Sequence, residues 1–169
     1  MKKKQRIKNL LLAGFLTILL LGIVWYVLQP DTDTPVDPVN PSVETDSVTE
    51  NGITVRESGE YTHKEEVALY LHAFNHLPSN FITKAEAKKL GWSGGGLEKY
   101  KQGGAIGGDN YSNYEKTLPV KKGRQYYECD IDTVRASKRG AKRLVYSNDG
   151  LIYYTDDHYE SFTLLYGEP

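Results

Sequence analysis

The chain has 169 residues, and its 21 Lys and Arg against 22 Asp and Glu give a formal net charge of −1. This near-neutral balance excludes overall charge as an argument for a nucleic-acid or membrane partner, so only local groups of charge are informative. The single cysteine, Cys129, excludes an internal disulfide, and a domain of this chain must therefore be stabilised by a packed core.

The N-terminus is typical of a membrane anchor. Residues 1–9 are rich in Lys and Arg, and residues 10–28, "LLLAGFLTILLLGIVWYVL", form an uncharged run long enough to cross a bilayer as a helix. The run is longer than the apolar core of a signal peptide, and no small-residue cleavage motif follows it. We therefore expect an anchor with the basic flank in the cytoplasm and the rest of the chain outside, or a secreted protein if the segment is cleaved.

Residues 29–60 differ from the anchor in composition. Between residues 30 and 60 there are four prolines, eight acidic residues and one basic residue, Arg56, with few large apolar side chains. Such a segment buries too little apolar surface to offset the entropy lost on ordering, and proline and like charges extend it. We expect a disordered acidic linker over 29–60, followed by one globular domain over 61–169.

Two short helices are predicted at the start of this domain. The pairs Thr62–Glu65 and Thr83–Glu86 both have the T-x-x-E spacing of a capping box, and each precedes a run with helical periodicity. Pro78 disfavours helical geometry at the residue before it, which ends the first helix.

Strands are predicted to follow a glycine-rich stretch, residues 93–110, that we interpret as loops. Beyond it the apolar period becomes two in "QYYECDI", and "RLVYSNDGLIYYT" has two apolar runs around a turn signal typical of a hairpin. The stretch "YESFTLLYG" predicts a last strand. Helices followed by an antiparallel meander indicate an α+β domain with its helices packed on one face of the sheet.

Three chemically matched side chains fall on the polar side of these predicted strands. Glu128 lies on the first strand, Arg143 begins the next, and His158 begins the last. Neighbouring strands would bring them together on one exposed face of the sheet, although a solvated charged face is ordinary for an antiparallel sheet. A carboxylate and an imidazole on opposite sides of a phosphodiester can act as general base and general acid, and a guanidinium between them can stabilise charge on the phosphoryl oxygens.

Five stretches, in order and with nearly matching spacing, resemble the small extracellular ribonucleases of the barnase and binase family. They are "LPSNFITKAEAKKLGW", "IGGDNYSNYEKTLP", "GRQYYECDI", "RLVYSNDGLIYYTDDHY" and "SFT". The resemblance implies a barnase-like α+β fold and an endoribonuclease that cleaves single-stranded RNA, preferentially after guanosine. The implied reaction forms a 2′,3′-cyclic phosphate that is then hydrolysed, without a metal or other cofactor. DNA lacks the attacking hydroxyl, so no stable DNA partner is expected.

Carried over to matching positions, the resemblance implies that Glu128 is the general base and His158 the general acid. It implies three cations around the reacting phosphate, namely Lys84, Arg139 and Arg143. The loop "YSNYE" would bind guanine, with the Glu115 carboxylate accepting hydrogen bonds from the base. The remaining residues implied at the site are Tyr111, Ser112, Asn113 and Tyr114 in that loop, Tyr159 as a stacking surface, and Asp109 as a support for Lys84 and the base.

Three departures from the family pattern affect the site. Tyr114 stands where the family usually has an arginine, which removes a positive charge near the phosphate and from the surface that an inhibitor protein binds. Gly150 replaces a usual tryptophan. The stretch "DTVRASKRGAKR" is one residue longer than its counterpart, which leaves Lys138 and Arg135 as alternatives to Arg139.

Two other functional classes stay open. One is a catalytically inactive surface module of the same fold that binds RNA or a protein, and the other is a structural or adhesive surface protein. The joint presence of a base, an acid and a central arginine argues against the first, and the second predicts no RNA chemistry and no effect of changing His158. The expected partners are single-stranded RNA, a barstar-like acidic inhibitor in the producing cell and the membrane through residues 10–28, and the domain is expected to be monomeric.

Overall fold

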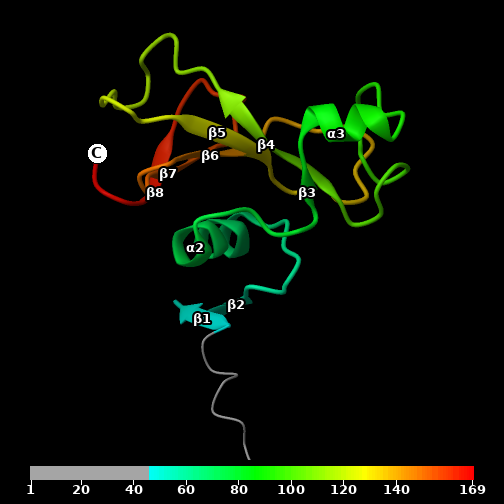
Figure 1. Cartoon of the computed structure of the whole chain (residues 1–169), viewed down its shortest axis with the longest axis horizontal. Helices are drawn as coiled ribbons and strands as arrows, with labels where there is room; N and C mark the ends of the chain where they lie inside the picture. The colour runs from blue at the N-terminus through cyan, green and yellow to red at the C-terminus, as the bar shows by residue number, and fades with distance from the viewer. Residues whose placement is uncertain (1–45) are drawn as a thin grey trace, which may run out of the picture. The chain divides into compact units, whose positions relative to one another are not determined.

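The computed structural model describes residues 46–169, so the predictions for the basic flank, for the apolar run and for the linker up to residue 45 lie outside the described residues. Figure 1 shows the arrangement of the helices and strands. Within residues 46–169 no helix is long and apolar enough to cross a bilayer. The elements, in chain order, are β1 (Ser47–Glu50), β2 (Ile53–Arg56), α2 (Lys64–Phe74), β3 (Phe81–Ile82), α3 (Lys84–Lys89), β4 (Ala105–Tyr111), β5 (Tyr126–Asp130), β6 (Arg143–Ser147), β7 (Ile152–Thr155) and β8 (Thr163–Tyr166).

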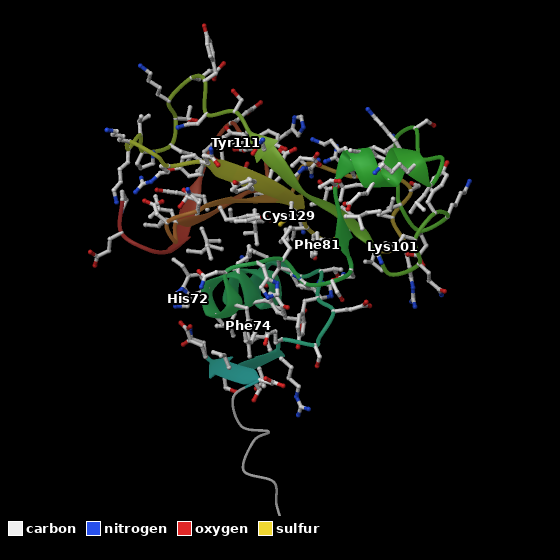
Figure 2. All side chains as sticks on the ribbon, viewed as in Figure 1. His72, Phe74, Phe81, Lys101, Tyr111 and Cys129 are labelled. Carbon is white, nitrogen blue, oxygen red and sulfur yellow. The ribbon has the colours of Figure 1, made fainter. Side chains whose placement is uncertain are left out.

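A six-stranded sheet with the order β3-β4-β5-β6-β7-β8 forms the centre of the domain. Strands β4 to β8 are antiparallel neighbours in chain order. The meander predicted from residue 125 onward is confirmed by β5 to β8, and the α+β class is confirmed with it. The prediction missed β3, a two-residue strand that pairs in parallel with β4 at the sheet edge. Helix α2 packs on one face of the sheet, and Cys129 and Phe81 lie in the core between them (Figure 2).

The glycine-rich stretch contains β4, so the prediction of loops was wrong for residues 105–110. Glycine is required here by a close approach between strands. A Cβ atom at Gly107 would lie 2.6 Å from Cys129 Cβ and 2.7 Å from Phe81 Cδ1, closer than packed carbon atoms allow. The register shifts between Gly107 and Asp109, which marks an irregularity that re-aims the end of β4.

The two predicted capping boxes have different outcomes. At α3, Thr83 Oγ1 accepts from the Glu86 backbone N–H at 3.2 Å and Glu86 Oε2 accepts from the Thr83 N–H at 2.8 Å, which confirms the prediction. At α2 the prediction was wrong, because the N-cap is His63 and its side chain makes no capping bond. The well-defined start of α3 matters for function, since its first residue lies in the candidate site.

The predicted linker was also wrong over residues 47–56, which form the hairpin β1–β2. Asn51 and Gly52 have φ of 49° and 80°, the left-handed pair typical of a two-residue type I′ hairpin turn. Val55 is fully buried against Leu69 and Tyr70, on the side of α2 that does not face the sheet. Composition favoured disorder here, but the alternating apolar residues of the hairpin give α2 a second packing partner.

Candidate active site

The carboxylate of Glu128 is the meeting point of three elements. Glu128 lies on β5 with 8% of its surface exposed. Lys84 Nζ, from the first residue of α3, is 2.5 Å from Oε1, and the Tyr159 hydroxyl, from the loop between β7 and β8, donates to Oε2. Both oxygens of a buried carboxylate are therefore bound by donors, which is how proteins keep such a group charged.

Opposing influences set the ionisation of this cluster. Burial acts to raise the pKa of Glu128, but hydrogen bonds from Lys84 and Tyr159 outweigh it and the pKa lies below the ordinary value. Burial and the Glu128 carboxylate raise the pKa of Tyr159 well above that of a free phenol. At neutral pH Glu128 is consequently an anion, and Tyr159 is a neutral hydroxyl that donates to it.

Asp109 fixes the position of Lys84. Strand pairing places Asp109 opposite Glu128, and Asp109 Oδ2 accepts a hydrogen bond of 2.9 Å from the Lys84 backbone N–H. A carboxylate at the first turn of a helix satisfies a backbone donor that has no partner within the helix. Asp109 thus holds the backbone from which the Lys84 side chain reaches Glu128.

A second acidic residue, Asp130, lies two positions along β5 and holds two guanidinium groups. Arg139 Nε and Nη2 donate to it at 2.6 and 2.7 Å, a bidentate pair. Arg143 Nε lies 2.9 Å from Asp130 Oδ1, but off the line of a good hydrogen bond, so this contact is an ion pair. Of the three basic residues considered for this position, Arg139 is the one whose guanidinium pairs with Asp130, beside Glu128 on β5.

Arg143 differs from expectation in its exposure. The sequence predicted it on an exposed face of the sheet, whereas only 2% of it is accessible. Its Nη1 donates to the carbonyl oxygen of Lys142 at 2.7 Å, and its Nη2 donates to that of Gly140 at 3.1 Å. The loop before β6 folds over the guanidinium because these carbonyl groups need donors, and this loop buries the side chain.

The charges of the cluster favour an anionic ligand. Three cations, Lys84, Arg139 and Arg143, stand against two carboxylates, Glu128 and Asp130. A partly buried excess of positive charge attracts a phosphate group more strongly than the same charges would in open water. Among residues 46–169, no three His, Cys, Asp or Glu side chains are grouped as metal ligands.

His158 was predicted to begin the last strand, and the structure corrects this placement. It lies in the loop between β7 and β8, its side chain is exposed, and β8 begins at Thr163. The residue pair His158 and Tyr159 has φ of 61° and 75°, and their ring centroids are 4.8 Å apart. Tyr159 therefore connects the exposed imidazole with the buried carboxylate of Glu128.

Asp157 holds this loop in its unusual conformation. Its Oδ1 accepts from Thr155 Oγ1 at 2.7 Å and from the Ser161 backbone N–H at 3.0 Å. Thr155 Oγ1 in turn accepts from the Tyr159 backbone N–H at 3.0 Å. Two consecutive left-handed residues are costly for non-glycine side chains, so a network of this kind is needed to keep them in place.

The loop predicted to read a base lies beside Tyr159. The Tyr111 ring is 5.3 Å from that of Tyr159, and the Asn113 side chain bonds both the carbonyl and the N–H of Leu118, at 2.7 and 3.0 Å. Tyr114 is 89% exposed. The other two predicted residues of this loop, Ser112 and Glu115, are also exposed.

Sequence reasoning brought most of the cluster together but missed two residues. Lys84, Glu128 and Tyr159 are in direct contact. The roles of Asp130 and Asp157 were not predicted, although Asp130 follows Glu128 at the period of two that places both on one side of β5. For Asp157, the available signal was its position two residues after Thr155 and four residues before Ser161 in "TDDHYES", a spacing at which an acidic side chain can bond to hydroxyl and backbone groups of its own loop.

Comparison with known proteins places the chain in a family. Residues 64–166, more than half of the chain, match the ribonuclease family. The ribonuclease of Bacillus intermedius is 50% identical over 99 residues, which cover 57% of this chain and 60% of that protein. The ribonuclease of Heyndrickxia coagulans is 50% identical over 98 residues, covering 57% of this chain and 89% of that protein.

Similarity extends to a more distant relative. Guanyl-specific ribonuclease St of Saccharopolyspora erythraea is 37% identical over 70 residues, which cover 41% of this chain and 65% of that protein. The match with the Bacillus and Saccharopolyspora proteins thus spans less than two thirds of their length, and all of these relatives are ribonucleases by name. On the family match and these identities, the chain belongs to the ribonuclease family.

Proposed function

We propose that the chain is an endoribonuclease that cleaves single-stranded RNA on the 3′ side of guanosine. The observation that carries the proposal is the ionised, buried Glu128 clamped by Lys84 and Tyr159, with the exposed His158 ring against Tyr159. This arrangement pairs a proton acceptor with a proton donor across a positively charged cluster. Membership in the ribonuclease family supports the same reaction class.

The first step is a transphosphorylation. Glu128 takes the proton of the ribose 2′-hydroxyl, the 2′-oxygen forms a bond to phosphorus, and the bond between phosphorus and the 5′-oxygen breaks. His158 gives its proton to the leaving 5′-oxygen. Lys84, Arg139 and Arg143 stabilise the charge on the phosphoryl oxygens, within the water-poor setting that makes such charge stabilisation effective.

The second step hydrolyses the 2′,3′-cyclic phosphate with the two roles exchanged. His158, now neutral, takes a proton from water, and the water oxygen attacks phosphorus. Glu128, now protonated, returns its proton to the 2′-oxygen as that bond breaks. Each residue regains its starting protonation state, so the cycle needs no other proton carrier.

Guanine selection is assigned to the loop from Tyr111 to Glu115. The name of a relative, guanyl-specific ribonuclease St, supports this choice of base. In the described structure the Asn113 side chain closes the loop onto Leu118, so that its exposed part is held rather than free. The Glu115 carboxylate is exposed and accepts hydrogen bonds from the guanine N–H groups, a charge-assisted pair.

The test uses the full-length chain in detergent and a short RNA with a single guanosine. Cleavage is expected after that guanosine to give a 2′,3′-cyclic end, and a 2′-deoxyguanosine at that position should abolish it. His158→Ala and Glu128→Gln should each lower kcat by about 10²–10⁴-fold. His76→Ala, an exposed histidine near Glu57, is the matched control and should be unchanged. A folded wild-type chain that binds but never cleaves this RNA, with or without a chelator, would favour the inactive binding module.

We propose further that the enzyme acts outside the cytoplasm, either anchored through residues 10–28 or released by cleavage of that segment. Protease treatment of intact cells should degrade residues 61–169, and the mass of the extracellular protein should reveal whether the anchor is retained. A domain that is protected in intact cells and degraded only after lysis would contradict export.

An acidic inhibitor of the barstar type is proposed to protect the producing cell. Tyr114 is 89% exposed in the loop where the family usually carries an arginine, so the surface lacks one positive charge. Tyr114→Arg should therefore tighten inhibition and steepen its dependence on salt. No change in the inhibition constant on this substitution would remove Tyr114 from the inhibitor surface.

A further inference from the structure

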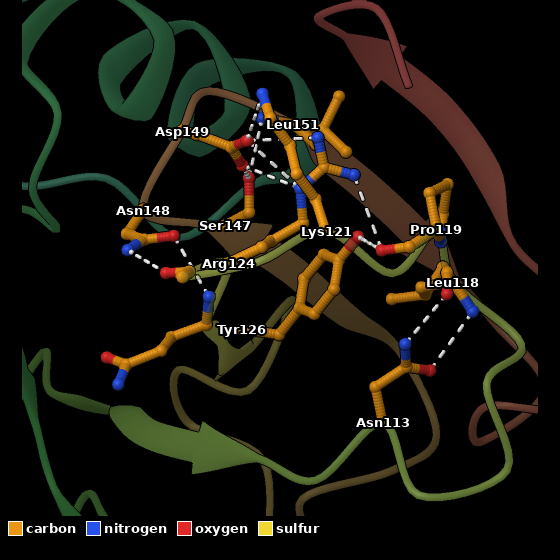
Figure 3. A network of polar contacts seen from close by, with 12 residues as sticks. Asn113, Leu118, Pro119, Lys121, Arg124, Tyr126, Ser147, Asn148, Asp149 and Leu151 are labelled. Carbon is orange, nitrogen blue, oxygen red and sulfur yellow. Dashed lines mark hydrogen bonds and ion pairs between the residues drawn. The ribbon is translucent and has the colours of Figure 1, made fainter.

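A continuous polar network joins the turn between β6 and β7 to the loop that is proposed to read guanine (Figure 3). Its centre is Arg124, whose side chain is only 4% exposed. Arg124 Nε and Nη2 donate to Asp149 at 2.9–3.0 Å, and its Nη1 points the other way, to the carbonyl oxygen of Pro119 at 3.3 Å. The Arg124 guanidinium thus connects the turn between β6 and β7 with Pro119, which follows the loop that is proposed to read guanine.

The Asp149 end of this network is rigid. Hydrogen bonds from Arg124 and then Ser147 hold the pKa of Asp149 far below its usual range, so the carboxylate stays charged. Ser147 Oγ donates to Asp149 at 2.7 Å and accepts from the Leu151 N–H at 2.9 Å, and Ser147 and Leu151 also share a backbone bond of 2.8 Å. Asp149 is therefore fixed to Ser147 and Leu151, the residues that close the β6–β7 turn, and it holds Arg124 in a defined position.

The Pro119 end receives a second donor. The Tyr126 hydroxyl donates to the same carbonyl oxygen at 2.9 Å. Tyr126 is 5% exposed and lies on β5, the strand that carries Glu128. Burial raises the pKa of Tyr126, so the phenol keeps its proton and remains a donor at neutral pH. Two side chains on one carbonyl group fix the chain just after the loop and ahead of β5.

The loop itself is closed immediately before that point. The Asn113 side chain bonds both polar groups of the Leu118 backbone, and the Lys116 N–H donates to the Asn113 carbonyl oxygen at 3.1 Å. Leu118 is 2% exposed and packs against Tyr126 and Val145. The exposed tip of the loop is therefore held at both of its ends, by the side-chain bonds of Asn113 on one side and by the donors to the Pro119 carbonyl oxygen on the other.

We infer that Tyr126 and Arg124 are positioning residues for base selection, acting through the carbonyl group of Pro119. The inference rests on the proposed function, in which this loop reads guanine. A loop that is already ordered loses less entropy when the base binds, and its N–H groups and Glu115 stay in register with the base edge. Loosening Pro119 should therefore reduce discrimination between bases while the clamp on Glu128 remains intact.

The experiment compares cleavage of two RNAs that differ only in guanosine or adenosine at the cleavage site, using the full-length chain. Tyr126→Phe removes one hydroxyl and should lower kcat/KM for the guanosine substrate by about two- to tenfold, the effect of one ordinary hydrogen bond. The kcat/KM for the adenosine substrate should change by less than about twofold, so the ratio of kcat/KM for guanosine to that for adenosine falls. Arg124→Lys keeps the positive charge but loses the planar guanidinium that bonds Asp149 and Pro119 at the same time, so it should lower this ratio further.

Tyr127→Phe is the matched control. It makes the same change on the next residue of β5, where the hydroxyl donates to Gln125 instead of the loop, at 3.0 Å. Its ratio should equal that of the wild type. Thermal unfolding of each variant separates the outcomes, because a purely stabilising role would lower the melting temperature and leave the ratio unchanged.

Two results would overturn the inference and are distinguishable. If the wild type prefers guanosine and Tyr126→Phe keeps that full preference, the positioning role fails while the proposed function stands. If the wild type cleaves RNA without preferring guanosine, the assignment of the loop to guanine fails and the positioning role fails with it.

Discussion

The hydroxyl of Tyr159 donates to one carboxylate oxygen of Glu128, and Lys84 binds the other. These donors overcome the effect of burial and keep the pKa of Glu128 below its ordinary value. The Tyr159 ring also lies 4.8 Å from the ring of His158. One side chain therefore both maintains the anionic state of the proposed base and positions the surface against which the proposed acid rests.

Replacing Tyr159 by phenylalanine should shift the acidic limb of the pH profile. In the first step of the proposed reaction Glu128 must be an anion to accept a proton, and losing one of the hydrogen bonds that lower its pKa raises that pKa. The midpoint of the acidic limb of kcat/KM should therefore move to higher pH by about one unit, since a hydrogen bond to a charged group contributes roughly 1.5–3 kcal/mol, partly replaced by water. The measurement is kcat/KM across acidic to neutral pH, with Tyr154→Phe on β7 as the control. An unmoved midpoint would mean that Lys84 alone sets the ionisation of Glu128.

Asp130→Asn should destabilise the fold strongly. Asp130 is 1% exposed and is the shared counter-ion of Arg139 and Arg143. Loss of its charge leaves a buried guanidinium uncompensated, which costs about 3–5 kcal/mol. The matched control is Asp132→Asn, because Asp132 also has two cationic partners, Lys142 and His63, but is one-third exposed, so about 1 kcal/mol or less is expected. Equal free energies of unfolding from urea titrations of the two variants would contradict this ranking.

The sequence alone predicted the strands of the site because their signals are local. The period of two in "QYYECDI" and the turn signal in "SNDG" are confirmed by β5 and by the hairpin β6–β7. The capping box of Thr83 and Glu86 likewise predicted the start of α3, from which Lys84 extends. Each of these features depends on a few neighbouring residues, so no knowledge of the tertiary structure was needed.

Burial could not be predicted in the same way. Alternation indicates that Glu128 and Asp130 share a side of β5, but not that the loop over residues 131–142 covers that side and buries Arg143. The hairpin β1–β2 was missed for a related reason. Its acidic, polar composition favoured disorder. The hairpin is stabilised because Val55 buries its apolar side chain against α2, a contact that the local sequence does not reveal. Both features depend on surfaces that are distant in the sequence.

Asp157→Ala should lower kcat with little effect on KM. Asp157 bonds Thr155 and Ser161 and so supports the left-handed pair His158 and Tyr159. Without it the loop should sample other conformations, and the fraction of molecules with His158 in place should fall, for a loss of roughly tenfold in kcat. Asp156→Ala, an exposed neighbour, is the control and should stay near the wild type. An unchanged kcat for Asp157→Ala would show that the loop is held without this network.

The same carboxylate predicts how the loop responds to pH. Hydrogen bonds from Ser161 and Thr155 lower the pKa of Asp157 to about 2. A carboxyl group with a lowered folded-state pKa contributes stability above its unfolded pKa and loses that contribution as the pH falls through the folded value. Acidification to about pH 4 should thus leave the loop intact. Solution NMR of the backbone amides of Tyr159 and Ser161 checks this, and their loss of protection already at pH 5 would contradict it.

Val55→Ala should destabilise the full-length chain by about 2 kcal/mol, the effect of removing two buried methyl groups and leaving part of the space empty. Val55 lies on β2 and is fully buried against Leu69 and Tyr70 of α2. The neighbouring Thr54 faces solvent and bonds only Thr49, at 2.8 Å, so Thr54→Ala is the matched control and should cost less than about 1 kcal/mol. Cleavage of RNA below the melting temperature should be unaffected in both, because the hairpin contacts the side of α2 that faces away from the sheet. Equal unfolding free energies for the two variants would mean that the hairpin does not pack on α2 in solution, and that the folded domain begins at α2.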